Sequence, residues 1–281
     1  MKDTKNEEIV YHYCSISTFL NIMKNCSLWM TEVEKSNDYA ERRYIEEKIK
    51  DQFKEIAKGD SELKQIPECT IDKCYDMIYS SLSVYACCLS EEGDLLSQWR
   101  AYADNGFGVS IGVSRKILED LNNEPYGLSF FKVIYDLKEQ YQYISGQVSL
   151  IKKTMEYKNF YASSAEVFAN NAAKNSCMKN PAFSEEKEWR LCIGMTPECR
   201  IGVKGKFNDM EMSEIMLYSN DRKIISYCDF SFKKKKKDFI KKIYLGPNCK
   251  MNENDMIHIL NILGFNANEI EILPSQASYR A

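Results

Sequence analysis

One segment of the sequence, residues 181–193, reads Pro-Ala-Phe-Ser-Glu-Glu-Lys-Glu-Trp-Arg-Leu-Cys-Ile. We expect a β-strand over 186–195, in which side chains alternate between two faces. One face would hold Trp189, Leu191 and Ile193, and the other Glu186, Glu188 and Arg190, with neighbours roughly 6 to 7 Å apart. The apolar face predicts a core contact. The charged face is typical of a chemical site and equally of a solvated surface.

The composition is that of a globular protein. The chain has 281 residues, of which 44% are hydrophobic and 28% charged, with a net charge of -3. No apolar run approaches the ~18 residues of a membrane span. The segment from Met1 to Glu8 lacks the apolar stretch of a secretory signal. We therefore expect a cytoplasmic protein with no membrane partner, and the small net charge gives no general attraction to nucleic acid.

The cysteines do not follow a metal-binding pattern. There are eleven, an odd number with scattered spacing, and no Cys-x-x-Cys pair occurs. Only two histidines, His12 and His258, are present. We expect reduced, mostly buried thiols and no metal site.

Predicted strands and helices are intermixed along the chain. Strands are expected near 9–14, 28–31, 83–90, 107–113, 130–135, 186–195, 199–204, 224–232, 240–246 and 269–273. Helices are expected after Ser15 or Ser17, and at about 39–58, 71–80, 95–102 and 253–263. The segment 139–178 predicts one long helix or two shorter ones. This order favours an α+β fold with a mixed or antiparallel central sheet and flanking helices. We expect one domain over 1–281, with 139–178 as a helical insertion or flank.

Most polar residues have a structural explanation when taken singly. His12 suits a hydrogen-bonded structural role, Asn37 and Glu41 suit helix capping, and Tyr102 suits the core. The sequence contains no phosphate-binding glycine loop, no nucleophile elbow and no His-Glu-x-x-His helix. Lys233 to Lys237 is the densest charge run, which indicates either phosphate contact or an ordinary solvated loop.

Several short motifs occur in a defined order along the chain: Tyr11-His12-Tyr13, Asn37-Asp38-Tyr39-Ala40-Glu41, Trp99-Arg100-Ala101-Tyr102-Ala103-Asp104, Glu186-Lys187-Glu188-Trp189-Arg190, Gly246-Pro247 and Ser275-Gln276-Ala277-Ser278-Tyr279-Arg280. In this order they resemble a bacterial domain family of unknown function, number 2971 in its series. The resemblance runs nearly end to end.

A second, weaker resemblance is to ADP-ribosyltransferases, a class that includes bacterial toxins. It rests on the Tyr-His strand near the N-terminus and the late Glu-x-Glu strand. It implies NAD as substrate and no metal. It further implies an ADP-ribosyltransferase-like core and these roles: a ribose contact for His12, stacking for Tyr13 or Tyr102, pyrophosphate binding or support of Glu188 for Arg190, a cofactor contact for Asn37, and catalysis for Glu188 with Glu186.

Three hypotheses follow. The first is an NAD-dependent ADP-ribosyltransferase or NAD glycohydrolase, acting as a toxin or antiphage defence effector. Its partners would be a nucleotide small molecule, a nucleic-acid or protein acceptor, and proteins of a defence operon. The second is a nucleic-acid-acting or sensing component, in which Lys233 to Lys237 contact the nucleic acid and clustered acids hold a divalent metal. The third is a non-catalytic interaction module. The first requires Glu188 to point into a cleft shared with His12.

Overall fold

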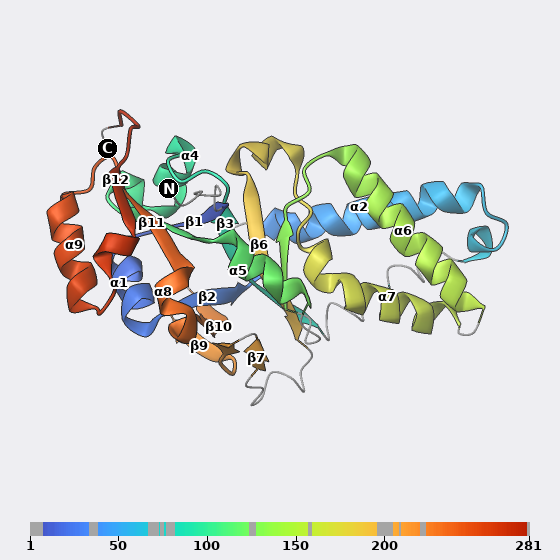
Figure 1. Cartoon of the computed structure of the whole chain (residues 1–281). Helices are drawn as coiled ribbons and strands as arrows, with labels where there is room; N and C mark the ends of the chain where they lie inside the picture. The colour runs from blue at the N-terminus through green and yellow to red at the C-terminus, as the bar shows by residue number, and fades with distance from the viewer. Residues whose placement is uncertain are drawn as a thin grey trace, which may run out of the picture.

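The computed structural model describes residues 8–33, 39–66, 82–123, 128–156, 159–195, 205–207, 209–219 and 223–279, with Lys73 and Asp76. It confirms the predicted α+β fold, since helices flank a 12-stranded, mostly antiparallel sheet (Figure 1). The strands are β1 (Ile9–Cys14), β2 (Ser27–Glu32), β3 (Ser83–Ser90), β4 (Val109–Ser114), β5 (Ser129–Lys132), β6 (Glu188–Met195), β7 (Gly205–Phe207), β8 (Met210–Met212), β9 (Met216–Ser219), β10 (Ile224–Ser231), β11 (Ile240–Leu245) and β12 (Glu271–Pro274).

The helices include α1 (Ile16–Asn25), α2 (Tyr39–Lys58), α4 (Leu96–Tyr102), α5 (Arg115–Glu119), α6 (Leu137–Met155), α7 (Phe160–Asn175), α8 (Lys236–Phe239) and α9 (Glu253–Ile262). Short polar residues begin several of them, as their side-chain oxygens accept from free backbone N–H groups. Ser15 caps α1, Asp136 caps α6 and Asn159 caps α7. A reciprocal pair, Asn252 with Asp255, caps α9.

The sheet forks at β3. One edge of β3 pairs with β6 along its whole length, from Ser83↔Met195 to Ser90↔Glu188. The other edge pairs with β1 at Ser90 and with β2 at Tyr85 and Ala86. Beyond β1 lie β4, β11 and β12, and beyond β2 lie β10, β8 and β7. The two arms of the sheet therefore diverge from a common stem, β3–β6–β5.

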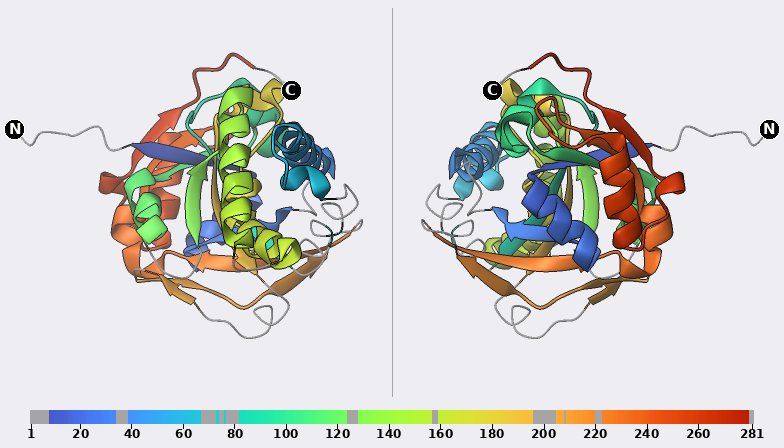
Figure 2. Two further views of the ribbon diagram at one scale, coloured as in Figure 1. Left: turned by 90° about the vertical axis from the view of Figure 1, so that its right-hand side faces the viewer. Right: turned by 90° about the vertical axis from the view of Figure 1, so that its left-hand side faces the viewer.

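A large apolar core fills the space between the arms. It includes Leu28, Ile111, Leu191 and Phe230, all fully buried. A second core lies on the other face of the stem, where α2, α6 and α7 pack, and includes Ile144, Val148, Phe168 and Cys192. These three helices extend away from the sheet as an arm (Figure 1), and Figure 2 shows the same arm end-on. The 139–178 segment thus forms two helices, α6 and α7.

The most informative difference from the sequence prediction concerns the start of β6. The strand begins at Glu188 and not at 186, because residues Pro181–Glu186 form the 3₁₀ helix η5. Asn180 caps this helix, and Lys187 ends it in a left-handed conformation with φ 46°. Glu186 therefore does not share the strand face of Glu188. The short strands β7, β8 and β9 were not predicted, and the strand expected near 199–204 lies outside the described residues.

Candidate functional site

The charged face of β6 is buried. Glu188 is 6% exposed and Arg190 3% exposed, beside the expected apolar partners Trp189, Leu191 and Ile193, whose burial is confirmed. Arg190 holds the Glu188 carboxylate with two bonds, Nε to Oε1 at 2.8 Å and Nη2 to Oε2 at 3.1 Å. Alternation along the strand brings the two side chains to the same side. Arg190 and Glu188 therefore form a bidentate ion pair with a defined orientation.

Lys179 joins this pair from the loop after α7. It is 6% exposed, and its Nζ lies 3.2 Å from Glu188 Oε2 and 2.6 Å from Glu186 Oε2. The backbone of Lys179 is fixed as well, because its N–H donates to Ile134 and its carbonyl accepts from the Gln140 side chain. Two carboxylates and two cations therefore form one cluster, named here the Glu188 cluster: Lys179, Glu186, Glu188 and Arg190.

The electrostatics of the cluster keep Glu188 ionised. Burial opposes ionisation, but the charge and hydrogen bonds of Arg190, with smaller contributions from Lys179 and the Cys88 thiol, outweigh it and lower the pKa of Glu188 to about 2. The guanidinium is itself anchored, since Arg190 Nη1 donates to the carbonyl of Ser176. The backbone N–H of Glu188 donates to Tyr135 Oη at 3.3 Å. The carboxylate is thus a fixed negative charge at neutral pH.

Exposed side chains surround the buried cluster. Cys88, opposite Arg190 in the β3–β6 register, is exposed. Tyr102 at the end of α4 is 48% exposed, and desolvation followed by the negative charge of Glu186 raises its pKa to about 12. Phe183 of η5 is 40% exposed, and Lys179 Nζ lies 5.0 Å from its ring centre. A neutral tyrosine and a phenylalanine therefore border the charged groups.

His12 lies at the fork of the sheet. Its Nδ1 is 3.1 Å from the carbonyl oxygen of Cys88, which lies on β3 between the residues that pair with β2 and with β1. Desolvation lowers the pKa of His12, so the ring is neutral. A carbonyl only accepts, so Nδ1 carries the proton and Nε2 is an acceptor. His12 contacts the backbone of the residue whose thiol faces Glu188.

Tyr13 is committed to internal contacts. Its hydroxyl donates to the Glu92 carbonyl at 2.7 Å and accepts from the Leu95 N–H at 2.8 Å. Its ring meets that of Trp99 edge-on, with centres 4.9 Å apart. Tyr13 therefore positions α4, the helix that ends at Tyr102.

The structure brings together five of the seven residues predicted for the site, directly or through one neighbour: Glu186, Glu188, Arg190, Tyr102 and, through Cys88, His12. Tyr13 does not contact the Glu188 cluster in the described contacts, and instead holds α4 through Leu95 and Trp99. Asn37 lies outside the described residues. The shared cleft of Glu188 and His12 stays a prediction.

Sequence reasoning missed Lys179, Cys88 and Tyr135. Lys179 is a single lysine two residues before Pro181, and nothing in the local sequence indicates an ionic partner. Cys88 needs the β3–β6 register, which pairs it with Arg190. Only its place in a central strand, next to Cys87, was visible in advance.

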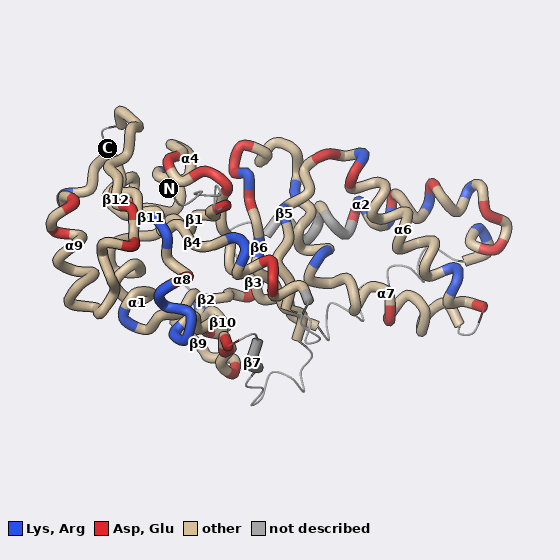
Figure 3. Tube along the Cα trace, viewed as in Figure 1, with Lys and Arg blue, Asp and Glu red and all other residues tan. Residues whose placement is uncertain are grey.

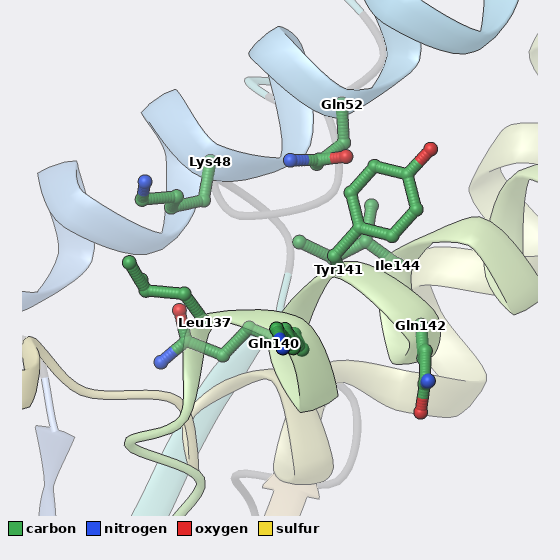
Figure 4. Close-up of a pocket in the computed structure, with 8 residues that line it drawn as sticks. Lys48, Gln52, Leu137, Gln140, Tyr141, Gln142 and Ile144 are labelled. Carbon is green, nitrogen blue, oxygen red and sulfur yellow. The ribbon is translucent and has the colours of Figure 1, made fainter.

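A separate cavity of about 550 Å³ lies between α2 and α6 (Figure 4). Lys48 and Gln52 of α2 face Leu137 and Tyr141 of α6 across it. Gln140, also in its wall, donates to the carbonyl of Lys179 at 2.9 Å. The helical arm is thereby tied directly to the Glu188 cluster.

Two kinds of feature are absent from the described residues. No group of three or more His, Cys, Asp or Glu side chains there could hold a metal ion. Within the same part of the chain, no helix combines the length and apolar character needed to cross a membrane.

Comparison with curated proteins and with solved structures gave no match. A family model does match, over residues 98–191. This segment runs from α4, which carries Tyr102, through α6 and α7 to the start of β6, and it contains the whole Glu188 cluster. The resemblance to the family of proteins of unknown function DUF2971 is thus confirmed over residues 98–191.

Proposed function

We propose that the chain cleaves the glycosidic bond between nicotinamide and ribose in NAD, as an ADP-ribosyltransferase or an NAD glycohydrolase. The observation that carries the proposal is the Glu188 carboxylate, held ionised and oriented by Arg190 beneath the exposed Cys88 and Tyr102. A fixed negative charge in a dry site stabilises a developing positive charge better than water does.

The chemistry needs such a charge. The bond between ribose C1′ and the nicotinamide nitrogen breaks, and its electron pair leaves with nicotinamide. The ribose becomes oxocarbenium-like, as in glycoside hydrolysis. A water molecule or an acceptor nucleophile then bonds to C1′ and releases a proton. Glu188 would stabilise the positive ribose, and it stays ionised throughout, because its pKa is about 2.

Neighbouring groups fit supporting roles. His12 Nε2 can accept from a ribose hydroxyl, since Nδ1 is occupied by the Cys88 carbonyl. Tyr102 is neutral and about half exposed, which suits stacking on nicotinamide. Arg190 orients Glu188 by its two bonds and need not reach the pyrophosphate. Glu186 would hold Lys179, which in turn holds Glu188.

One observation favours a second candidate, a non-catalytic interaction module. Both oxygens of Glu188 are already bonded to cations within the protein. The two charges of Glu186 and Glu188 are matched by those of Lys179 and Arg190, which is also how a purely structural buried network is built. In that case the Glu188 cluster stabilises the fold, and the exposed residues beside it, Cys88, Tyr102 and Phe183, contact a partner protein.

The biological setting belongs to the same proposal. An NAD-consuming enzyme of this kind would act in the cytoplasm as a toxin or antiphage defence effector. A nucleic-acid or protein acceptor and partner proteins of a defence operon would be its macromolecular contacts.

The test measures nicotinamide release from NAD by the purified chain. Glu188→Gln should lower the rate about 100-fold, because a directed electrostatic contact to the transition state is removed. Glu92→Gln is the matched control, since Glu92 is exposed and paired with Lys187, and it should keep full activity. Circular dichroism and thermal melting confirm that each variant is folded. Absence of NAD binding and of nicotinamide release in the parent, with Glu188→Gln folded normally, sinks the enzyme proposal and leaves the interaction module.

A further inference from the structure

An aromatic cluster covers the outer face of the part of the sheet formed by β2, β10 and β9. The Trp29 ring stacks on Tyr227, with centres 4.1 Å apart and planes at 25°, and also lies 5.6 Å from Tyr218. The three residues come from three neighbouring strands, with Trp29 on β2, Tyr227 on β10 and Tyr218 on β9. We name this cluster the aromatic platform.

The platform faces away from the core. Along β10, alternate residues Cys228 and Phe230 point inward and are fully buried. The opposite face carries Tyr227, while Trp29 is 39% and Tyr218 45% exposed. Three rings grouped on one exposed face are more than the scattered single hydrophobic residues of an ordinary surface.

Lysines lie at both ends of the strand that carries the platform. Lys223 precedes β10, and the run Lys233 to Lys237 follows it after Phe232. Figure 3 shows this run as the blue segment beside α8. Four of these, Lys233, Lys234, Lys236 and Lys237, line a cavity of about 410 Å³ beside Phe265. Tyr227 to Ser231 spans roughly 13 Å of extended chain, after which the backbone turns at Phe232 into the short helical segments that carry the lysines. The lysines therefore lie beyond the end of the strand that carries Tyr227.

Not every lysine is available to a ligand. Lys234 pairs with Glu211 at 3.0 Å, and Lys236 donates to the Leu263 carbonyl at the end of α9. Lys233 and Lys237 are exposed, and the described part of the chain gives neither an ion pair. These two are the cations that a partner would meet.

This combination distinguishes between polyanions. Sequence-tolerant binding of single strands uses rings that stack on bases and cations that follow the phosphates. A duplex keeps the faces of its bases stacked inside and offers phosphates and groove edges instead. An anionic membrane also offers negative charges, but it has no bases that could stack on the exposed rings.

We propose that the aromatic platform and the lysines after β10 form a binding surface for single-stranded nucleic acid. Bases stack on Tyr218 and on the exposed part of Trp29, and phosphates contact Lys233 and Lys237. The surface is distinct from the Glu188 cluster, so its function does not depend on NAD chemistry.

The experiment measures binding of the full chain to a labelled single strand of about 12 nucleotides, within the roughly 4–16 that one such surface covers. Tyr218→Leu should weaken binding roughly tenfold, as expected for losing a base stack. Tyr141→Leu on α6 is the matched control, because Tyr141 is equally exposed at 45%, and it should leave binding unchanged.

The salt dependence tests the lysines separately. Lys233→Gln with Lys237→Gln should reduce the slope of log K against log salt by about 1.4, from about 0.7 per phosphate contact. Lys138→Gln with Lys153→Gln on α6 makes the same charge change elsewhere and should keep the parental slope. The proposal is overturned by equal effects of the two tyrosine variants, by duplex binding as tight as single-strand binding, or by anionic vesicles binding where the oligonucleotide does not. A parent chain that binds no single strand at low salt overturns it too.

Discussion

The two faces of β6 are buried to the same degree by different means. Trp189 is 8% exposed and packs on Phe130 with ring centres 4.9 Å apart. The hydrophobic effect stabilises its burial. Glu188, 6% exposed, is enclosed by Arg190 and Lys179, and its burial depends on charge pairing. Alternation along a strand therefore separates apolar from polar residues without separating inside from outside.

Loss of the apolar contact should have the largest effect. Trp189→Ala should cost roughly 4 kcal/mol of unfolding free energy, since it removes the stack on Phe130, the guanidinium of Arg115 over the ring and the bond to Glu91. Urea denaturation measures this. A loss below about 1 kcal/mol would mean that the ring is not part of the core.

Loss of the charge partner should come next. Arg190→Met should cost about 3 kcal/mol, because Glu188 stays buried with only Lys179 as a cation. The same denaturation assay measures it. The double variant Glu188→Gln with Arg190→Met removes both charges and should recover much of the loss. A double variant less stable than Arg190→Met would show that the pair acts mainly through packing.

Acid should weaken the charge pairing of Glu188. The pKa of Glu188 is about 2 in the fold against 4.5 when unperturbed. A lowered pKa stabilises the fold above the unfolded value, and this contribution is lost as pH falls toward the folded one. Between pH 6 and pH 3 the parent should lose roughly 2 kcal/mol that Glu188→Gln does not lose. Parallel pH profiles of the two proteins would contradict this.

Lys179 should give the smallest effect. Lys179→Met should cost about 1.5 kcal/mol, because Glu188 keeps Arg190 and Glu186 is closer to solvent. Melting temperatures of this variant and of Lys187→Met, a surface lysine paired with Glu92, give the comparison. Equal melting temperatures for the two would place Lys179 outside the network.

The sequence predicted the elements better than the site. Trp189, Leu191 and Ile193 were identified from period two alone, because alternation is local. The start of β6 was placed two residues early, because Lys187 adopts a left-handed conformation with φ 46° that lysine rarely takes. The place of Glu186 on the strand face was wrong for the same reason.

Local sequence patterns could not predict the residues that contact Glu188 from distant parts of the chain. Lys179 reaches Glu188 from a loop after α7, and Cys88 reaches it through strand register. Local sequence signals also gave no aromatic platform beside the lysine run. Trp29 and Tyr227 are 198 positions apart in the sequence and meet only through the β2–β10 pairing.

The fork at β3 has a consequence for synthesis of the chain. The edge of β2 is completed only by β10, and contacts such as Ser27 with Asp229 join residues 202 positions apart. At about 5 to 20 residues per second, β2 waits roughly 10 to 40 s for its neighbour. During that time Leu28 and Met30 stand on an unpaired edge, the kind that recruits other strands. The nascent chain is therefore most vulnerable to aggregation before residue 231 is made, and chaperone dependence should end once β10 has docked.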